Sequence, residues 1–389
     1  MSTTPIWLED PYEPRPPLEG DVTAEACVIG AGIGGLAAAW HLLDRGIRPV
    51  VLEARAVASG ASGRNGGFFI AGAAPMYHRT IALWGAERAR RIHAATVSAK
   101  AEILALAEEI EAREHFRIAG MLRLAVDAAE AQDVRDHHAA LAADGFGGEL
   151  VAATALPEAL RGRGRIGLFL AADGSVHPVR WLRALAAACA ARGARVHEGT
   201  PVVGVPAGGV VRTASATVRT GAVVVAMDAG LAALVPAARA VRPRRLNMLA
   251  TAPEPARRLP FPVYARDGHE YAQQLPDGRV VLGGFSDLDG PDGWTDREAP
   301  SERVQARLEA YLREELGVAA PVASRWAGVV GYAEDPMPRC GPAAPGTYAL
   351  GGYNGTGQVQ AYVAARIVAD LIAGGSSPDD GLYAAVAAG

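Results

Sequence analysis

One stretch, residues 24–53, constrains the fold more than any other part of the sequence. An apolar run at 26–29 predicts a buried parallel strand, and the pattern at 36–43 predicts a helix that ends at Gly46. A second apolar run at 47–52 predicts the next strand, directly before Glu53. Three glycines stand between the first strand and the helix with G-x-G-x-x-G spacing: Gly30, Gly32 and Gly35. This order predicts an α/β unit with a dinucleotide site.

Each part of this stretch has a physical role in holding a dinucleotide. Gly30 permits a tight turn, Gly32 lets the backbone approach a pyrophosphate, and Gly35 lets the helix touch the strand. The helix N-terminus presents free N–H groups to the phosphates, and Glu53 can accept hydrogen bonds from ribose hydroxyls. The alternative is a glycine-rich turn in another kind of α/β protein. The expected cofactor contacts here are Gly30, Gly32, Ile33, Gly34, Gly35, Glu53, Ala54 and Arg55.

Two later glycine-rich segments are expected to contact the same ligand. Residues 58–69 are mostly small, so their backbone can wrap a ligand closely, and Ser62, Arg64 and Asn65 can add polar contacts. A plain surface loop is the alternative interpretation. At 349–357 a second glycine-rich junction leads into a helix predicted at 359–373. A two-ended cofactor, long enough to touch both junctions, would explain this repetition.

The composition excludes several classes of partner. The chain has 389 residues, which is enough for two domains, and its net charge of -4 gives no reason to expect nucleic acid as a partner. Cys27, Cys189 and Cys340 lie far apart without metal-ligand spacing, so we expect reduced thiols in a cytoplasmic protein and no metal. The apolar segment 26–43 contains too many glycines for a membrane span. Lys100 is the only lysine, and its helical surroundings suggest a place away from any motif.

The rest of the chain alternates between helical and strand-like patterns. We expect a proline-rich surface arm at 1–22, one helix or a kinked pair at 80–113, and a helix at 128–143 with His137 and His138 exposed. The segment 168–192 predicts a strand, an Asp-Gly turn and a helix that His177 precedes. Apolar or alternating patterns predict strands at 116–126, 196–205, 210–220, 223–226, 246–251 and 271–284, a helix at 303–316, and an apolar run at 326–331 that ends in a turn.

Several of these motifs together resemble a known family. They are the fingerprint with Glu53, the segment 59–67, DGSVHP at 173–178, EGTPV at 198–202, WAGVVGYAEDPMPRCG at 326–341 and GGYNGTG at 351–357. The set is similar to the flavin-dependent family of D-amino acid oxidase, glycine oxidase and sarcosine oxidase. The likeness covers roughly residues 24–373 and is strongest to the branch with gamma-glutamylputrescine oxidoreductase.

This resemblance implies a fold that combines α/β and α+β parts. A discontinuous Rossmann-like FAD-binding domain would comprise 1–85, 150–235 and 326–389. An antiparallel-sheet substrate-binding domain would comprise 86–149 and 236–325. Val202 would lie at the adenine, and the flavin would be lined by Ser62, Gly63, Arg64, Asn65, Gly66, Gly67, Gly352, Tyr353, Gly355, Thr356 and Gly357.

The resemblance also implies a reaction. The flavin N5 of the family accepts a hydride from a carbon next to an amine nitrogen, and water hydrolyses the resulting imine. The arginine that holds a substrate carboxylate in glycine oxidase falls near Val330, so an α-amino acid would need Arg339 or another arginine. The lysine that activates oxygen in sarcosine oxidases falls near Val281, so oxygen or another carrier could be the electron acceptor. No cysteine or histidine matches a flavin attachment site, and we expect non-covalent FAD.

Four residues are candidates for the chemistry. A pocket with aromatic walls favours the neutral amine by desolvation, and its ring faces can hold the cation on entry. Tyr271 and Tyr332 adjoin the flavin motifs, although either could be an ordinary core aromatic, as Trp326 could. His269 could act as a base or face solvent. Asn354 could contact flavin or substrate, or serve only the turn.

Three functions compete on this evidence. The leading prediction is an FAD-dependent oxidoreductase of an amine or modified amino acid. An enzyme for free D-amino acids or glycine, and an NAD-dependent dehydrogenase on the same fingerprint, are the enzymatic alternatives. A flavin-bearing binding protein without turnover is the non-enzymatic one.

Overall fold

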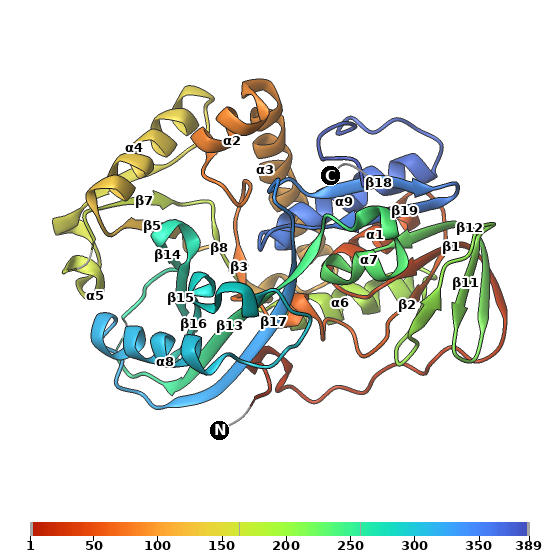
Figure 1. Cartoon of the computed structure of the whole chain (residues 1–389), viewed down its shortest axis with the longest axis horizontal. Helices are drawn as coiled ribbons and strands as arrows, with labels where there is room; N and C mark the ends of the chain where they lie inside the picture. The colour runs from red at the N-terminus through yellow and green to blue at the C-terminus, as the bar shows by residue number, and fades with distance from the viewer. Residues whose placement is uncertain (1–2, 163, 257, 387–389) are drawn as a thin grey trace.

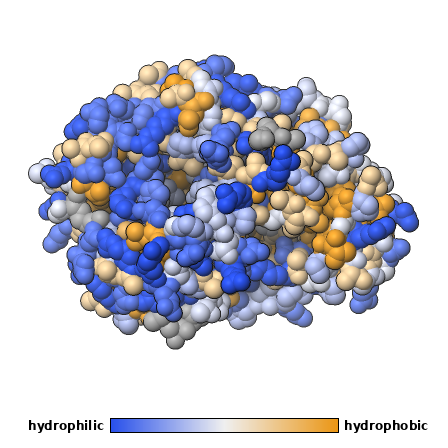
Figure 2. Space-filling view, in the orientation of Figure 1, coloured by the Kyte–Doolittle hydropathy of each residue, from blue (hydrophilic) through white to orange (hydrophobic). Residues whose placement is uncertain are grey.

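The computed structural model describes residues 3–162, 164–256 and 258–386 (Figure 1). Two large sheets and one small sheet account for the strands of this part of the chain. On the face shown in Figure 2, hydrophobic residues are scattered among hydrophilic ones. In the described residues no helix is both long and apolar enough to cross a membrane. The helices are α1 (Ile33–Asp44), α2 (Tyr77–Trp84), α3 (Ala86–Glu109), α4 (Ala128–Ala143), α5 (Glu158–Arg161), α6 (Pro178–Ala191), α7 (Leu231–Leu234), α8 (Glu302–Ala310) and α9 (Gly357–Ile372).

The first large sheet is built around the apolar strands that flank the glycine fingerprint. Its order is β10 (Val202–Gly204), β11 (Val210–Thr213), β12 (Thr217–Val225), β1 (Val22–Ile29), β2 (Pro49–Leu52) and β9 (Arg195–His197). From β12 to β9 all neighbours are parallel, whereas β10, β11 and β12 form an antiparallel meander. The hairpin of β18 (Arg339–Ala344) and β19 (Thr347–Gly351) joins by a parallel pairing of β19 with β12. Helices α1, α6 and α9 pack together beside this sheet. The predicted Rossmann-like sheet is confirmed.

The second large sheet has eight strands and forms the other lobe (Figure 1). Its order is β17 (Val322–Tyr332), β13 (Arg242–Pro253), β16 (Arg279–Gly284), β15 (Glu270–Gln274), β14 (Val263–Ala265), β5 (Met121–Ala125), β7 (Ile166–Leu170) and β6 (Glu149–Ala152). All neighbours are antiparallel except β14 and β5. Leu308 of α8 packs with Leu249 and Leu282 in the core of this lobe. The predicted antiparallel sheet is therefore confirmed.

A small sheet of β3 (Phe68–Phe69), β8 (Gly174–Val176) and β4 (Phe116–Arg117) connects the lobes. The sheet membership differs from the predicted segment boundaries at two places. Strand β7 lies beyond the boundary at 150, and most of β17 beyond the boundary at 326, yet both pair within the antiparallel sheet. The apolar run at 326–331 does not end in a turn, because it continues the long pairing of β17 with β13 to Tyr332.

The helical pattern at 80–113 forms a pair of helices, α2 and α3, with Gly85 between them at φ +82, as one of the two predicted alternatives had it. Three further predictions differ from the structure. His137 is buried rather than exposed, and its Nδ1 accepts a hydrogen bond from the Tyr77 N–H. The Lys100 side chain is also buried, where it pairs with Asp173 of the DGSVHP motif. The N-terminal arm is not wholly on the surface, since Trp7 is only 2 % exposed.

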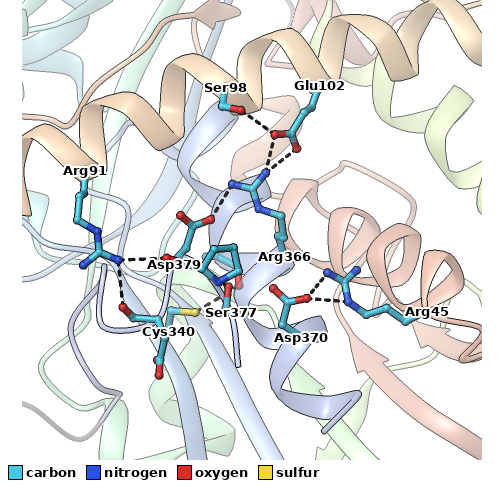
Figure 3. Close-up of polar contacts among 12 residues, drawn as sticks. Arg45, Arg91, Ser98, Glu102, Cys340, Arg366, Asp370, Ser377 and Asp379 are labelled. Carbon is cyan, nitrogen blue, oxygen red and sulfur yellow. Dashed lines mark hydrogen bonds and ion pairs between the residues drawn. The ribbon is translucent and has the colours of Figure 1, made fainter. Parts of the chain in front are cut away.

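Ion pairs hold α9 in place at its C-terminal half (Figure 3). Arg366 donates to both carboxylate oxygens of Glu102 on α3 at 2.6 Å, and to Asp379 of the C-terminal segment at 2.7 Å. One turn further along, Asp370 pairs with Arg45 at the end of α1. These contacts fix α9 against two other helices, so the loop before its first turn projects from a well-anchored element.

Candidate active site

The first glycine corner has the geometry that a close approach of strand and helix demands. Gly30 has φ +102, a conformation that favours glycine, and its N–H donates to the Leu52 carbonyl at 2.8 Å. A Cβ on Gly35 would lie 1.8 Å from the Gly30 carbonyl oxygen. Only glycine at position 35 therefore allows α1 to cross β1 at this distance. The Ile33 N–H, in the first turn of α1, donates to the Ser62 hydroxyl at 3.0 Å.

Glu53 braces this corner from the end of β2. Its Oε2 accepts from the Ala31 N–H at 2.8 Å and its Oε1 accepts from the Arg55 N–H at 2.9 Å. Ala54 and Arg55 are exposed, and the Arg55 guanidinium pairs with Glu298 at 2.8 Å. The loop before Val202 lies beside this strand end, because the Thr200 N–H donates to the Glu53 carbonyl at 2.7 Å.

The polar side chains of the 58–67 loop form hydrogen bonds with the protein's own backbone. The Asn65 amide donates to the Ser62 carbonyl at 2.7 Å and accepts from the Gly67 N–H at 2.7 Å. The Arg64 guanidinium donates to the Ser59 and Ala327 carbonyls. These two side chains therefore shape the loop, and its backbone is what remains for a ligand.

Two buried indoles fix this loop from opposite sides. The Trp7 Nε1 donates to the Asn65 carbonyl at 2.7 Å, and the Trp326 Nε1 donates to the Arg64 carbonyl at 2.9 Å. Trp7 comes from the N-terminal arm and Trp326 from β17. The loop is thus held by the N-terminal arm and by the antiparallel sheet.

The second glycine corner depends on Asn354. This residue has φ +51, its Oδ1 accepts from the Ala333 N–H at 3.0 Å, and its Nδ2 donates to the Gly352 carbonyl at 2.9 Å. Both the Oδ1 and the Nδ2 of this side chain are therefore hydrogen-bonded to the backbone. Gly355 follows with φ +90, and α9 begins at Gly357.

A carboxylate that we did not predict joins this corner to the antiparallel sheet. Asp228 Oδ1 accepts from the Gly352 N–H at 2.9 Å, and Oδ2 accepts from the Gly331 N–H at 2.8 Å. Burial raises the pKa of Asp228, and its backbone hydrogen bonds oppose that rise. The sequence signal was available, since Asp228 follows the apolar strand 223–226 at the carboxyl end of a parallel sheet, where ligands gather.

Both glycine corners line one cavity of about 570 Å³ between the two large sheets. Of the predicted site residues, the cavity wall includes Gly32, Ile33, Gly34, Ser62, Arg64, Asn65, Gly66, His269, Tyr271, Tyr332, Tyr353, Asn354, Gly355, Thr356 and Gly357. Those outside the wall are Gly30, Gly35, Glu53, Ala54, Arg55, Gly63, Gly67, Val202 and Gly352. Most of the first group lies at the two helix N-termini and in the 58–67 loop, and much of the second belongs to the turn and strand ends behind α1.

The antiparallel sheet supplies the aromatic side of this cavity. The rings of Tyr271 and Tyr264 lie 5.9 Å apart, and Phe68 packs edge-on against Tyr271 at 5.9 Å. Burial raises the pKa of the three tyrosines that this sheet contributes to the wall, Tyr264, Tyr271 and Tyr332, so their phenols stay neutral near pH 7. His269 is half exposed, and its Nδ1 lies 4.0 Å from an Asp287 oxygen.

Val330 and Val281, the two positions at which this chain departs from the family pattern, also lie in places that bring no charge to the cavity. Val330 lines the cavity, as expected of its position, and contributes no charge. Val281 is buried in the core. Arg339 is buried beside Asp335, with Nη1 and Oδ2 3.4 Å apart, and does not line the cavity. Lys100 faces a different cavity, of about 690 Å³, below α3.

The residues present fit a dinucleotide that carries a flavin. A Cβ on Gly32 would lie 2.8 Å from the Ser62 Oγ, and one on Gly34 would lie 2.7 Å from a Leu350 methyl, so these glycines keep the cradle open. Two N-terminal helix turns face the cavity, where their N–H groups suit phosphate or carbonyl oxygens. The Gln358 Nε2 and the Tyr353 hydroxyl are buried without a hydrogen-bond partner among the described residues.

A parallel dinucleotide-binding sheet joined to an antiparallel sheet over one shared cavity defines a two-domain flavoprotein oxidoreductase. The comparison with protein families agrees, because the model described as DAO, FAD dependent oxidoreductase, matches residues 25–371. The chain belongs to this family and is an FAD-dependent amine or amino acid oxidoreductase.

Curated relatives align over nearly the whole chain. A probable oxidoreductase OrdL of Rhizobium meliloti is 28% identical, covering 96% of this chain and 89% of the relative. Gamma-glutamylputrescine oxidoreductase of Escherichia coli is 27% identical, covering 93% and 87%.

Solved structures show the same fold at lower identity. Glycine oxidase from Geobacillus kaustophilus superposes with a TM-score of 0.75 at 22% identity, covering 92% of this chain and 96% of that one. L-proline dehydrogenase from P. horikoshii also superposes with a TM-score of 0.75, at 21% identity, covering 93% and 96%.

Proposed function

We propose that this protein oxidises the CH–NH bond of an amine or a modified amino acid to an imine, which water then hydrolyses. The observation that carries the proposal is the cavity wall near the glycine corners, where Tyr271 and Tyr332 stand with the uncharged Val330. A free α-amino acid needs a cation for its carboxylate next to the reacting carbon, and Val330 supplies none. The name of the Escherichia coli relative, an oxidoreductase of gamma-glutamylputrescine, supports a substituted amine as substrate.

FAD would be held without a covalent bond by the backbone of the two glycine corners and the 58–67 loop. The first turn of α1 would face the pyrophosphate, Glu53 the ribose, and Val202 the adenine. The unpartnered Gln358 amide and the first turn of α9 suit the carbonyl groups of the isoalloxazine ring. When bound, FAD supplies the two-electron acceptor that oxidation of a CH–NH bond requires.

The chain's own residues would prepare the amine. The tyrosine rings exclude water, which disfavours the protonated amine and leaves the nitrogen lone pair free to assist oxidation. Because their phenols are neutral, Tyr271 and Tyr332 act as walls and hydrogen-bond donors rather than as bases. His269 stands at the exposed rim, where it can pass a proton to solvent. Asn354 positions the second corner, since both ends of its amide are bound to backbone.

The experiment is anaerobic reduction of the bound flavin by a panel of polyamines, N-methyl amino acids and free D-amino acids. Bleaching by the first two classes, with little by the third, supports the proposal. Bleaching by free D-amino acids alone would favour the amino acid oxidase alternative. A flavin that no member of the panel reduces would favour a binding protein without turnover. Reoxidation by oxygen, compared with artificial quinone acceptors, then identifies the class of electron acceptor.

A further inference from the structure

Arg123 is a buried cation without a counter-ion. It lies at the centre of β5, it is only 7 % exposed, and it lines both the cavity of the glycine corners and the neighbouring cavity below α3. Among the described residues, no hydrogen bond or ion pair reaches its guanidinium, and its Nε is fully buried. Its guanidinium carbon lies over the face of Tyr264, 5.6 Å from the ring centre.

Three carboxylates that line these cavities with Arg123 are already paired with other cations. On one side Asp173 binds Lys100. On the other side Asp267 pairs with Arg79 at 2.5 Å and Asp287 with Arg266 at 3.1 Å. None of these carboxylates is left to neutralise Arg123.

The two nearby histidines cannot neutralise Arg123 either. Burial and the charges of Lys100 and Arg123 lower the pKa of His93 to about 4, and burial and the charge of Arg123 lower that of His137 to about 2. Both rings are therefore neutral near pH 7. Burying an unpaired charge destabilises a fold, and a cation–π contact recovers only part of that cost. Such a cation is expected where a ligand provides the missing anion.

The sheet register places Arg123 at the far end of one row of side chains. Met248 is opposite Gly283, Gly283 opposite Tyr271, Tyr271 opposite Tyr264, and Tyr264 opposite Arg123. Residues directly opposite each other point to the same face of a sheet. Neighbouring strands are about 4.8 Å apart, so the Arg123 backbone lies about 14 Å from that of Gly283, three strands away.

The other end of this row adjoins the cofactor loop. A Cβ on Gly66 would lie 3.2 Å from the Tyr271 ring, and the Trp326 indole, opposite Met248, donates to the Arg64 carbonyl. The row thus runs from the predicted flavin loop, past two tyrosines, to an unpaired guanidinium.

We propose that Arg123 binds a carboxylate carried at the far end of the substrate, several methylene groups away from the oxidised CH–NH bond. This inference rests on the proposed function, and it names the substrate class as amines with a remote carboxylate. The amine would lie beside Tyr271, the chain would follow Tyr264, and the carboxylate would form a charge-assisted pair with the guanidinium. The cation at Arg123 then stands far from the reacting carbon, whereas Val330 is uncharged and Arg244, opposite Val330, donates to the Ser286 and Gly290 carbonyls.

Equilibrium binding tests the anion site without any turnover. Hexanoate and hexanamide are titrated by calorimetry into the FAD-loaded wild type and the variants Arg123→Met, Arg123→Lys and Arg244→Met. Arg244 is the matched control, because it lines the same cavity but donates to the Ser286 carbonyl. We expect hexanoate to bind at least tenfold more weakly to Arg123→Met, while Arg123→Lys keeps part of the affinity. Hexanamide binding should be equal in all four proteins. Unchanged hexanoate binding in Arg123→Met, or its loss in Arg244→Met alone, would overturn the proposal.

Stability and reduction kinetics complete the test. Arg123→Met should melt no lower than the wild type, because it removes an unpaired buried charge; a lower melting temperature would mean that Arg123 serves the fold. In anaerobic reduction, ω-amino carboxylates of increasing length should outperform the matching ω-amino amides at least tenfold at one optimal length. This preference should vanish in Arg123→Met. If no amine reduces the flavin, the proposed function fails, and the calorimetry still decides whether Arg123 binds a carboxylate.

Discussion

Gly32 and Gly355 line the same cavity, although they stand near opposite ends of the sequence. The first belongs to the turn before α1 and the second to the turn before α9. Helices α1 and α9 pack against each other, so their N-terminal turns open toward one ligand site. This arrangement suits a cofactor with a phosphate group at one turn and a polar ring at the other.

Gly32→Ala should weaken FAD binding while leaving the fold intact. The new Cβ would lie 2.8 Å from the Ser62 hydroxyl, which must then move away from the Ile33 N–H. We expect at least a tenfold higher Kd for FAD, about 1.4 kcal/mol, measured by fluorescence titration of the apoprotein. Gly204→Ala is the control, because no atom lies within 4 Å of its added Cβ. Equal FAD affinity in both variants would contradict the assignment.

Asp228→Asn should destabilise the junction of the two sheets. An amide can accept from only one of the Gly352 and Gly331 N–H groups and turns a donor toward the other. Leaving a buried N–H without an acceptor costs about 1–3 kcal/mol, which chemical denaturation at saturating FAD would detect. Asp296→Asn, at an exposed position, should change the free energy of unfolding little. A stability loss of equal size in both variants would show that Asp228 has no special role.

Tyr271→Phe should retain the pH dependence of flavin reduction. The pKa of Tyr271 is raised by burial and by the neighbouring tyrosines, so the phenol is neutral at all working pH values. The rate should rise with pH as the substrate amine loses its proton, equally in both proteins, and stopped-flow reduction from pH 6 to 10 measures this. Loss of a general base would lower the rate by about 10²–10⁴-fold. A decrease of that size, with a flattened pH profile, would make Tyr271 the base.

Buried histidines should make the protein sensitive to acid. The pKa of His137 is lowered to about 2 by burial, compared with about 6.5 in the unfolded chain. The unfolded state therefore binds the extra proton between these values, and stability is lost as the pH falls below 6.5. In His137→Asn, whose amide oxygen can still accept from the Tyr77 N–H, the slope of unfolding free energy between pH 6 and 4 should decrease by about 1 kcal/mol per pH unit. Parallel profiles for the two proteins would refute this explanation.

The fold could be predicted from the sequence wherever the local sequence pattern and the tertiary environment favour the same structure. The turn at Gly30, the strands beside it and the helix after Gly357 each have a period or a glycine spacing that only one environment satisfies. The family resemblance extended this to the antiparallel sheet. The sheet membership of β7 and β17 was not accessible in this way, because they are apolar segments whose pattern does not reveal which sheet they join.

Side-chain roles were less accessible, because they depend on partners distant in sequence. Asn65 was expected to add a polar ligand contact, and Asn354 either to contact flavin or substrate or to serve only the turn; both bind backbone that the sequence could not place beside them. His137 sits on a helix with charged neighbours, and only the packing of α2 against α4 buries it. The sequence did not indicate a role for Arg123. A single arginine in an apolar strand becomes informative only when the structure shows that nearby carboxylates are paired with other residues.

Strand β5 belongs to the portion of chain between β3 and β8, whereas the sheet strands nearer the cofactor loop come from residues 242–332. The proposed contact of Arg123 with a substrate carboxylate and the proposed contacts to the reacting centre would therefore be encoded in separate stretches of the gene. Mutations confined to the first stretch would change which substrates the enzyme accepts, while the oxidation reaction itself stays intact. Divergence among related enzymes, and the exchange of segments between them by engineering, should follow the same division.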